Sequence, residues 1–257
     1  MKTSIQDLIS SKGRGRKLAC LTAYDYPTAR VLDETGLDII LVGDSLGMVV
    51  LGHADTTMVR MEDMLHHTRA VARGVLRACV VSDLPAGSTP SAEAAAENAL
   101  QLVEAGADAV KIEGGHECVR IVEAIRGAGV PVIGHLGMLP QRVRLEGGYR
   151  IKGRSGAEAD RILSEALALE RAGVAAIVLE LVHPPLAAAI SRSLKIPTIG
   201  IGSGPHCDGQ ILVIHDVAGM FPWFRPPFAK VRADVAGEIR RAAEEFVAET
   251  RGELSPS

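Results

Sequence analysis

The feature that most constrains the fold is a repeated join between a helix and a strand. The segments ETGLDII, EAGADAV and RAGVAAI each place a glycine after a stretch of helical character and then begin a short apolar run. A glycine at this point supplies the left-handed residue with which many helices end. Strands that alternate with longer helical stretches in this way predict βαβ units and a parallel sheet.

The predicted strands are apolar on both faces, which is typical of parallel strands covered on both sides. They occupy Leu18–Thr22, Asp38–Gly43, Ala78–Ser82, Ala109–Ile112, Val130–Gly134, Ala175–Leu179, Thr198–Ile201 and Ile211–His215. The predicted helices occupy Tyr26–Glu34, Met61–Arg73, Ser91–Glu104, Glu117–Arg126, Ala157–Arg171, Leu186–Ser193 and Asp234–Thr250. About eight such units predict an α/β fold, the (β/α)8 TIM barrel. An open doubly wound sheet is the competing arrangement, but no GxGxxG follows the first strand.

Composition narrows the organisation and the classes of function. No linker interrupts the chain, so we expect one barrel domain over residues 1–257, with a short N-terminal extension and the polar tail RGELSPS. A net charge of −3 without a long basic block argues against a nucleic-acid surface. The N-terminus lacks the apolar core of a secretory signal, and no apolar run approaches the roughly 20 residues of a membrane span. The four cysteines form no CxxC pair. We expect a cytoplasmic protein with neither nucleic acid nor membrane as partner.

Polar residues stand where most of the predicted strands end. In a barrel of this class the active site lies at the carboxyl ends of the strands. The residues found there, in chain order, are Asp25, Asp44, Ser45, Asp83, Lys111, Glu113, His135, Glu180 and Asp216. Lys111 and Glu113 are two positions apart, so on a strand they point to the same face. Alone they would be read as a buried ion pair, but the other strand ends favour a converging polar pocket.

Three of these residues indicate a metal site. Asp44, Asp83 and Glu113 offer only oxygen, the donor that Mg²⁺ prefers, and Mg²⁺ takes one or two carboxylates together with water and substrate oxygens. No HxH pair or Cys/His cluster favours structural zinc. A magnesium site with few protein ligands leaves positions open for a bidentate substrate.

Two glycine-rich segments allow two interpretations each. GIGSGPHCDG could be a phosphate-binding loop of the kind found late in barrels, or a tight turn beside the pocket. EGGYRIKGRSG could be a mobile lid or a plain solvated loop.

The whole set of strand ends resembles the ketopantoate hydroxymethyltransferase (3-methyl-2-oxobutanoate hydroxymethyltransferase) family. The likeness covers nearly the whole chain and rests on GDSLGMVVLG, HHTRAVARG, VSDLPAGS, AVKIEGG, VIGHLGMLPQ, GGYRIKGR and GIGSGPHCDGQILVIHD. The resemblance implies a barrel of the phosphoenolpyruvate mutase and isocitrate lyase group. It also implies transfer of a hydroxymethyl group from 5,10-methylenetetrahydrofolate to 3-methyl-2-oxobutanoate, which gives 2-dehydropantoate for pantothenate and coenzyme A synthesis.

The resemblance also assigns roles to residues of this chain. It implies that Asp44 and Asp83 bind Mg²⁺ and the substrate, and that Glu113 belongs to the metal site. Ser45, Lys111 and His135 match substrate-binding or site-lining positions, and Glu180 matches the general base. Family members form large ring-like oligomers, so a homodecamer, a pentamer of dimers, is implied for this chain.

This chemistry agrees with the residue types. A 2-oxo acid can chelate Mg²⁺, which then stabilises an enolate at C3, while Lys111 adds positive charge and Glu180 removes the C3 proton. Two alternatives stay open: a Mg²⁺-dependent carbon–carbon lyase or aldolase acting on another 2-oxo acid, and a non-catalytic barrel that only binds a metal–oxo-acid complex. Folate dependence separates the transferase from the lyase.

Overall fold

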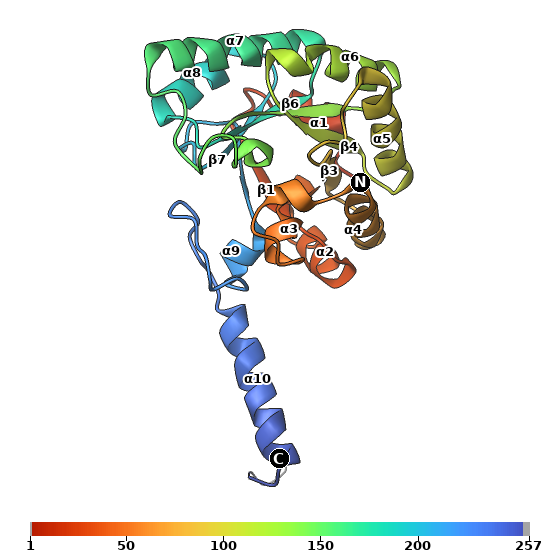
Figure 1. Cartoon of the computed structure of the whole chain (residues 1–257), viewed down its shortest axis with the longest axis vertical. Helices are drawn as coiled ribbons and strands as arrows, with labels where there is room; N and C mark the ends of the chain where they lie inside the picture. The colour runs from red at the N-terminus through yellow and green to blue at the C-terminus, as the bar shows by residue number, and fades with distance from the viewer. Residues whose placement is uncertain (1, 254–257) are drawn as a thin grey trace. The chain divides into compact units, whose positions relative to one another are not determined.

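The computed structural model describes residues 2–253 and contains a closed barrel of eight parallel strands (Figure 1). The strands follow one another around the barrel in chain order, which confirms the predicted (β/α)8 fold class. Their bounds are β1 Leu18–Thr22, β2 Ile39–Val42, β3 Cys79–Asp83, β4 Ala109–Glu113, β5 Val132–Gly137, β6 Ala176–Glu180, β7 Thr198–Ile201 and β8 Gly209–Leu212. The chain divides into two compact units, with the boundary between Ile211 and Leu212. The extent of the predicted single domain, residues 1–257, stays a prediction.

Helices connect the strands, as the alternating pattern predicts. Their bounds are α1 Ile5–Ser10, α2 Tyr26–Asp33, α3 Leu46–Val49, α4 Met61–Gly74, α5 Ala92–Glu104, α6 Val119–Gly127, α7 Gly156–Ala172, α8 Pro184–Ser193, α9 Ile214–Ala218 and α10 Val235–Thr250, with 3-10 turns η1 Thr56–Met58, η2 His116–Cys118 and η3 Pro140–Arg142. The glycines of the three repeated joins, Gly36, Gly106 and Gly173, all have positive φ. Gly173 is itself the left-handed C-cap of α7.

The predicted eighth strand, Ile211–His215, is wrong in its position. The strand that closes the barrel is β8, which begins at Gly209, and the apolar run that follows belongs to α9. The Leu18 N–H donates to the Asp208 carbonyl at 3.0 Å, which joins the two ends of the barrel. A Cβ at Gly209 would lie 2.7 Å from the Leu18 Cβ, so only glycine allows this approach. Periodicity could not reveal this close approach, because the run Ile211–His215 has a composition more typical of a strand.

Aspartates hold the amino ends of the strands. Asp38, just before β2, accepts a hydrogen bond from the Ala19 N–H of β1 at 2.9 Å. Asp108, before β4, does the same for Val80 of β3 at 2.8 Å, and Asp208, before β8, for Thr198 of β7 at 2.9 Å. Each carboxylate therefore satisfies a backbone donor near the start of the neighbouring strand. This face of a TIM barrel serves stability.

The interior of the barrel is apolar in its amino-terminal half. One cluster joins inward-facing side chains of all eight strands with Leu8 of α1, which is fully buried. Its members are Leu8, Leu18, Cys20, Ile39, Leu41, Cys79, Val81, Ala109, Ile133, Ala176, Val178, Ile199 and Ile211. Helix α1 therefore contributes a side chain to the core of the barrel. The four cysteines, which form no CxxC pair, are buried and unpaired.

The second unit, which begins at Leu212, contains α9 and α10. Helix α9 ends at Gly219, whose φ is 67°, and a Cβ there would clash with the Ala233 carbonyl. The Arg232 N–H donates to the Val217 carbonyl at 2.8 Å, so the connection to α10 folds back on α9.

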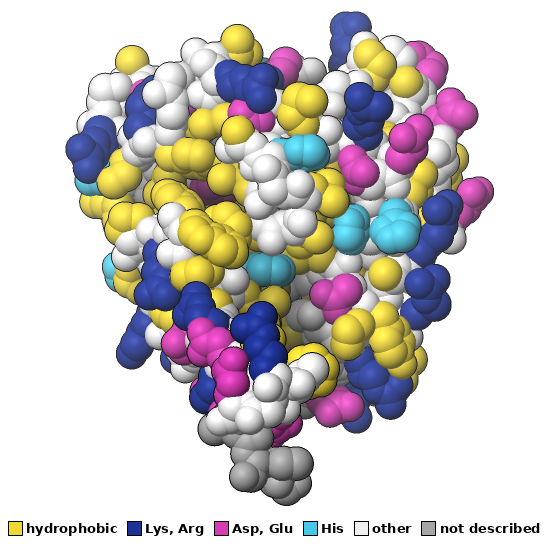
Figure 2. All heavy atoms as spheres, turned by 60° about the horizontal axis from the view of Figure 1, so that its bottom comes forward, with side chains coloured by type: hydrophobic (Ala, Val, Ile, Leu, Met, Phe, Trp, Pro, Cys, Tyr) yellow, Lys and Arg dark blue, Asp and Glu magenta, His cyan; other side chains and the backbone are white. Residues whose placement is uncertain are grey.

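Over residues 2–253, no helix is long and apolar enough to cross a membrane. On the face drawn in Figure 2, Lys and Arg side chains are interspersed with Asp, Glu and hydrophobic ones.

Candidate active site

The site is a continuation of the barrel's inward-facing rows of side chains. On β3 the inward positions run Cys79, Val81, Asp83, and on β4 they run Ala109, Lys111, Glu113. The same alternation carries β5 to His135 and β6 to Glu180, because successive inward positions on a strand are two apart. Each row is apolar toward the amino end and polar at the carboxyl end.

The strand register brings the polar ends together. Asp83 of β3 pairs with Lys111 of β4, and Glu113 of β4 pairs with His135 of β5. Glu180 of β6 lies opposite Gly137 of β5. Five of the predicted site residues therefore lie near the carboxyl ends of the neighbouring strands β3 to β6.

Lys111 lies among the acidic side chains. Its Nζ is 3.2 Å from the Asp83 Oδ1 and 3.9 Å from the Glu113 Oε1. Burial disfavours the charged ammonium, but the carboxylates of Asp83 and Glu113 raise the pKa of Lys111 above its ordinary value. Lys111, whose side chain is 6% exposed, is thus a buried positive charge beside these carboxylates.

Asp44 and Asp83 form an adjoining pair of buried carboxylates. The Asp44 N–H donates to the Asp83 Oδ2 at 3.1 Å. Burial, with the nearby charge of Asp83, raises the pKa of Asp44 well above its ordinary value. Burial also raises the pKa of Asp83, although Lys111 opposes the shift. A cation bound beside them would stabilise the ionised form of each carboxylate.

Glu113, His135 and Glu180 form a row. The His135 Nδ1 is 3.3 Å from the Glu113 Oε1, and its Nε2 is 3.3 Å from the Glu180 Oε2. Burial and Lys111 disfavour the imidazolium, but Glu113 and Glu180 outweigh them and raise the pKa of His135 to about 9. Burial likewise opposes ionisation of Glu113, yet contact with His135 leaves its pKa lowered. The shift favours the imidazolium, but the Lys111 Nζ, which can only donate, lies 3.2 Å from the same Nδ1.

Ser45 and Glu180 occupy the edges of the site. Ser45 is the N-cap of α3 and its Oγ is 2.8 Å from the Tyr24 hydroxyl. The Glu180 side chain is 14% exposed, whereas those of His135 and Glu113 are each 3% exposed. Glu180 is therefore the carboxylate of this row that a ligand can reach.

Two of the strand-end acids are not part of this group. Asp25 is the N-cap of α2, where its carboxylate accepts from the Thr28 N–H at 2.8 Å. Asp216 was expected at the end of the eighth strand but lies on α9, in the second unit. Burial raises the pKa of Asp216 to about 6.

Two residues of the site are not indicated by the strand pattern, although Gln141 ends the motif VIGHLGMLPQ. Gln141, in turn η3, donates through Nε2 to the Asp44 Oδ2 at 2.8 Å. Leu181, directly after Glu180, has φ 48° and is the one non-glycine residue with positive φ in the described chain. This conformation costs roughly 1–2 kcal/mol for an L residue. It is held because the Leu181 N–H donates to Ile201 and its carbonyl accepts from Lys152.

The donor set fits a hard cation bound by few protein ligands. Four carboxylates, those of Asp44, Asp83, Glu113 and Glu180, face two cationic side chains, so negative charge is in excess. The Asp83 Oδ1 and the Glu113 Oε1 are buried without a hydrogen bond of good geometry. No three Asp, Glu, His or Cys side chains of residues 2–253 are grouped closely enough to hold a metal alone. Two carboxylates completed by water and substrate are the arrangement that Mg²⁺ uses.

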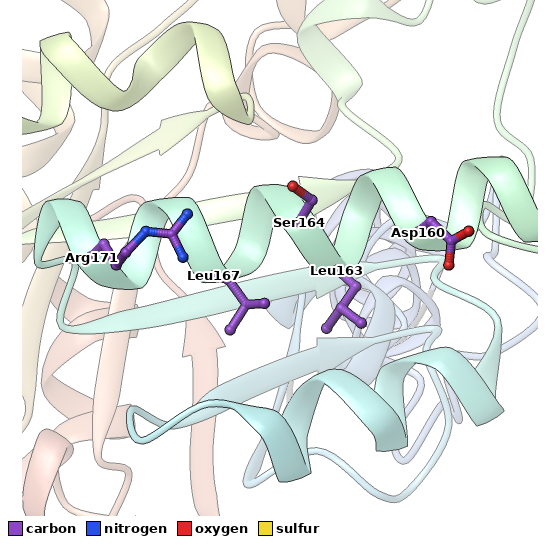
Figure 3. A pocket seen from close by; sticks show the side chains of 5 residues that line it. All are labelled: Asp160, Leu163, Ser164, Leu167 and Arg171. Carbon is purple, nitrogen blue, oxygen red and sulfur yellow. The ribbon is translucent and has the colours of Figure 1, made fainter.

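A surface pocket lies elsewhere, on the outer helix α7. It is lined by Asp160, Leu163, Ser164, Leu167 and Arg171. Figure 3 shows the two leucines on one side of the helix and Ser164 on the other. None of the strand-end residues lines it, so it is separate from the candidate site.

A closed (β/α)8 barrel with ionisable side chains gathered at the carboxyl ends of its strands defines a TIM-barrel enzyme. Residues 2–257 match the family described as ketopantoate hydroxymethyltransferase. The chain belongs to this family, which confirms the predicted family and class of enzyme.

Several relatives support this membership. A 3-methyl-2-oxobutanoate hydroxymethyltransferase of Acetivibrio thermocellus is 51% identical, over 100% of this chain and 91% of its own. A protein of the same description from Ignicoccus hospitalis is 51% identical, over 97% of this chain and 95% of its own. One from Pyrobaculum islandicum is 53% identical, over 96% of this chain and 94% of its own.

Solved structures share the fold. The barrel is similar to phosphonopyruvate hydrolase in complex with oxalate and Mg²⁺, with a TM-score of 0.67 and 17% identity over 100% of this chain and 92% of that one. It is also similar to 2,3-dimethylmalate lyase, a member of the PEP mutase/isocitrate lyase superfamily, with a TM-score of 0.65 and 16% identity over 100% and 90%. These similarities show the shared barrel fold.

Proposed function

We propose that this chain transfers a hydroxymethyl group from 5,10-methylenetetrahydrofolate to 3-methyl-2-oxobutanoate and forms 2-dehydropantoate, a step of pantothenate and coenzyme A biosynthesis. The observation that carries the proposal is the position of Glu180. Its partly exposed carboxylate lies beside buried His135, in the group that contains Lys111, Asp83 and Asp44. The names of the relatives support the same activity.

Asp44 and Asp83 would hold Mg²⁺, and Glu113 would support it from the next strand. When bound, Mg²⁺ would polarise the keto and carboxylate oxygens of the oxo acid and stabilise the enolate. Phosphonopyruvate hydrolase, which has a similar barrel, binds oxalate together with Mg²⁺, and this is consistent with the same chemistry here. Lys111 would add a fixed positive charge where oxyanion charge develops.

Glu180 is the acceptor for the C3 proton. His135 is the nearest alternative base, but its side chain is 3% exposed, whereas that of Glu180 is 14% exposed. Glu113 and Glu180 raise the pKa of His135 to about 9, and a charged imidazole between them would stabilise both carboxylates. Ser45, whose Oγ is 2.8 Å from the Tyr24 hydroxyl, would bind the substrate carboxylate.

The decisive experiment measures product from 3-methyl-2-oxobutanoate with and without 5,10-methylenetetrahydrofolate and Mg²⁺. The proposal requires that both be needed. Product without folate would contradict the transferase and favour a lyase or aldolase that acts on another oxo acid.

The base is tested by Glu180→Gln, which keeps size but cannot accept the proton. We expect exchange of the C3 hydrogen into deuterated water, followed by NMR without folate, to slow roughly 10²–10⁴-fold while substrate binding is kept. Glu104→Gln, at the exposed end of α5, is the matched control and should exchange at the wild-type rate. Exchange by the Glu180 variant at the wild-type rate would rule out Glu180 as the base.

Assembly and location are further parts of the proposal. We propose a homodecamer, a pentamer of dimers, that works in the cytoplasm on small molecules and not on nucleic acid or membrane. The exposed side chains of Ile239 and Phe246 on α10 support assembly, because large apolar side chains at 58% and 69% exposure favour association. Light scattering during size-exclusion chromatography would measure the state, and a monomer would contradict it.

A further inference from the structure

Gln141 contacts the ends of three strands at once. Its side-chain Nε2 donates to the Asp44 Oδ2 at 2.8 Å and to the Leu84 carbonyl at 3.0 Å. Its backbone N–H donates to the Glu113 Oε2 at 3.1 Å. Asp44 follows β2, Leu84 follows β3 and Glu113 ends β4, so one residue of the loop after β5 joins them all.

We propose that Gln141 is a positioning residue, which holds the carboxylates of Asp44 and Glu113 in the orientation that takes up a divalent cation. This inference rests on the proposed function, because it assumes that Asp44 is a ligand of the cation.

The orientation of the amide follows from its partners. A glutamine amide has two N–H donors on Nε2 and an acceptor at Oε1. The Asp44 carboxylate and the Leu84 carbonyl both accept, so both donors of Nε2 are used. A flipped amide would place Oε1 against two acceptors. The side chain therefore has one stable orientation, and it fixes Asp44 through Oδ2 while leaving Oδ1 for a ligand.

The backbone contact acts on Glu113 in a complementary way. Glu113 receives the Gln141 N–H on Oε2, and its Oε1 faces the His135 Nδ1 at 3.3 Å. The Oε2 is thus held by a hydrogen bond, while the Oε1 has none of good geometry and is left for a ligand. Such outer contacts set the orientation of metal-binding side chains, and their loss typically lowers metal affinity or activity about 10–100-fold.

The loop that carries Gln141 is itself fixed. Arg142 pairs with Glu117 at 2.5 Å, just after β4, and Arg144 pairs with Asp55 at 2.6 Å, in the segment after β2. Exposed ion pairs are weak individually. Placed on either side of the site, they nonetheless keep η3 across the same strand ends that Gln141 contacts.

Gln141→Met tests the side chain alone, because it keeps the length and the backbone N–H to Glu113 and removes both amide hydrogen bonds. Gln210→Met is the matched control, since Gln210 donates its amide to the Gly204 carbonyl at 3.1 Å and contacts none of the acidic side chains. Mg²⁺ binding to each full-length protein is measured by calorimetry. We expect the Kd for Mg²⁺ to rise about 10–100-fold in the Gln141 variant and to stay at the wild-type value in the control.

The KM for Mg²⁺ and kcat, measured separately, distinguish a positioning role of Gln141 from general damage to the fold. Positioning predicts a raised KM for Mg²⁺ with kcat largely restored at saturating Mg²⁺. Unchanged Mg²⁺ affinity in the Gln141 variant, when the wild type binds Mg²⁺, would overturn the inference and leave the proposed function intact. A wild type that binds no Mg²⁺ would instead contradict the proposed function. If the Met variant does not fold, Gln141→Asn, which is one methylene too short to reach Asp44, is measured with the same two criteria.

Discussion

Asp33 provides the sharpest test of how the barrel is stabilised. It lies at the end of α2, and its carboxylate accepts backbone hydrogen bonds from Leu76 at 2.8 Å, Arg77 at 3.0 Å and Ala78 at 2.8 Å. These residues lead into β3, so one side chain fixes the backbone at the start of that strand. Burial would raise the pKa of Asp33, but the three N–H donors outweigh it and lower the pKa. We expect Asp33→Asn to lower the free energy of unfolding.

The magnitude follows from which donors lose a partner. A hydrogen bond to a charged group contributes about 1.5–3 kcal/mol. Leu76 is 78% exposed and its N–H can turn to water, whereas Ala78 is fully buried. The main loss is therefore one charged hydrogen bond with a buried donor, partly replaced by the amide oxygen of asparagine. We expect a loss of about 2 kcal/mol at pH 7, or roughly 4–8 °C in Tm for a chain of this size.

The pH dependence has a definite sign. A carboxylate whose pKa is lower in the folded state stabilises above its unfolded pKa, near 3.9, and loses that stabilisation as the pH falls through the folded pKa. The difference between wild type and Asn variant should therefore shrink as the pH falls below about 4. Urea unfolding at several pH values measures it, with Asp160→Asn on exposed α7 as the control. A loss under about 0.5 kcal/mol at pH 7, or a gap that stays constant into acid, would refute this reasoning.

Three further predictions concern the site and its loops. Asp44→Asn and Asp83→Asn should weaken Mg²⁺ and oxo-acid binding together, and full-affinity oxo-acid binding without Mg²⁺ in calorimetry would contradict a bridging cation. Gly137→Ala should lower Tm and activity, because φ is 99° and the new Cβ would clash with the Glu180 carbonyl; an unchanged Tm would show that β5 and β6 can move apart. Inorganic phosphate should not compete with the oxo acid in an inhibition assay, and strong competition that Gly204→Val abolishes would indicate a phosphate site.

The sequence predicts most of the strands because burial on both faces leaves a continuous apolar run. It also places Lys111 and Glu113 on one face, because two inward positions on a strand are two residues apart. The closing strand could not be found in this way. It depends on the close approach of Gly209 to Leu18, which is a contact between the two ends of the barrel.

The residues of the candidate site also differ in whether the sequence could predict them. Asp83, His135 and Glu180 end regular strands, so pattern and resemblance both point to them. Gln141 comes from a three-residue turn without periodicity, and its importance depends on which carboxylates the turn reaches. Leucine is not a residue type that indicates a left-handed backbone, so the sequence could not predict the positive φ of Leu181.

The burial of Leu8 has a consequence for the order of folding. The core cluster that contains it draws side chains from every strand, including Ile211 of β8. These partners do not exist as a packed surface until the last strand has joined the first. Helix α1 must therefore wait for almost the entire barrel before it can dock. We expect Leu8→Ala to accelerate unfolding far more than it slows folding, since contacts made after the transition state act on the unfolding rate.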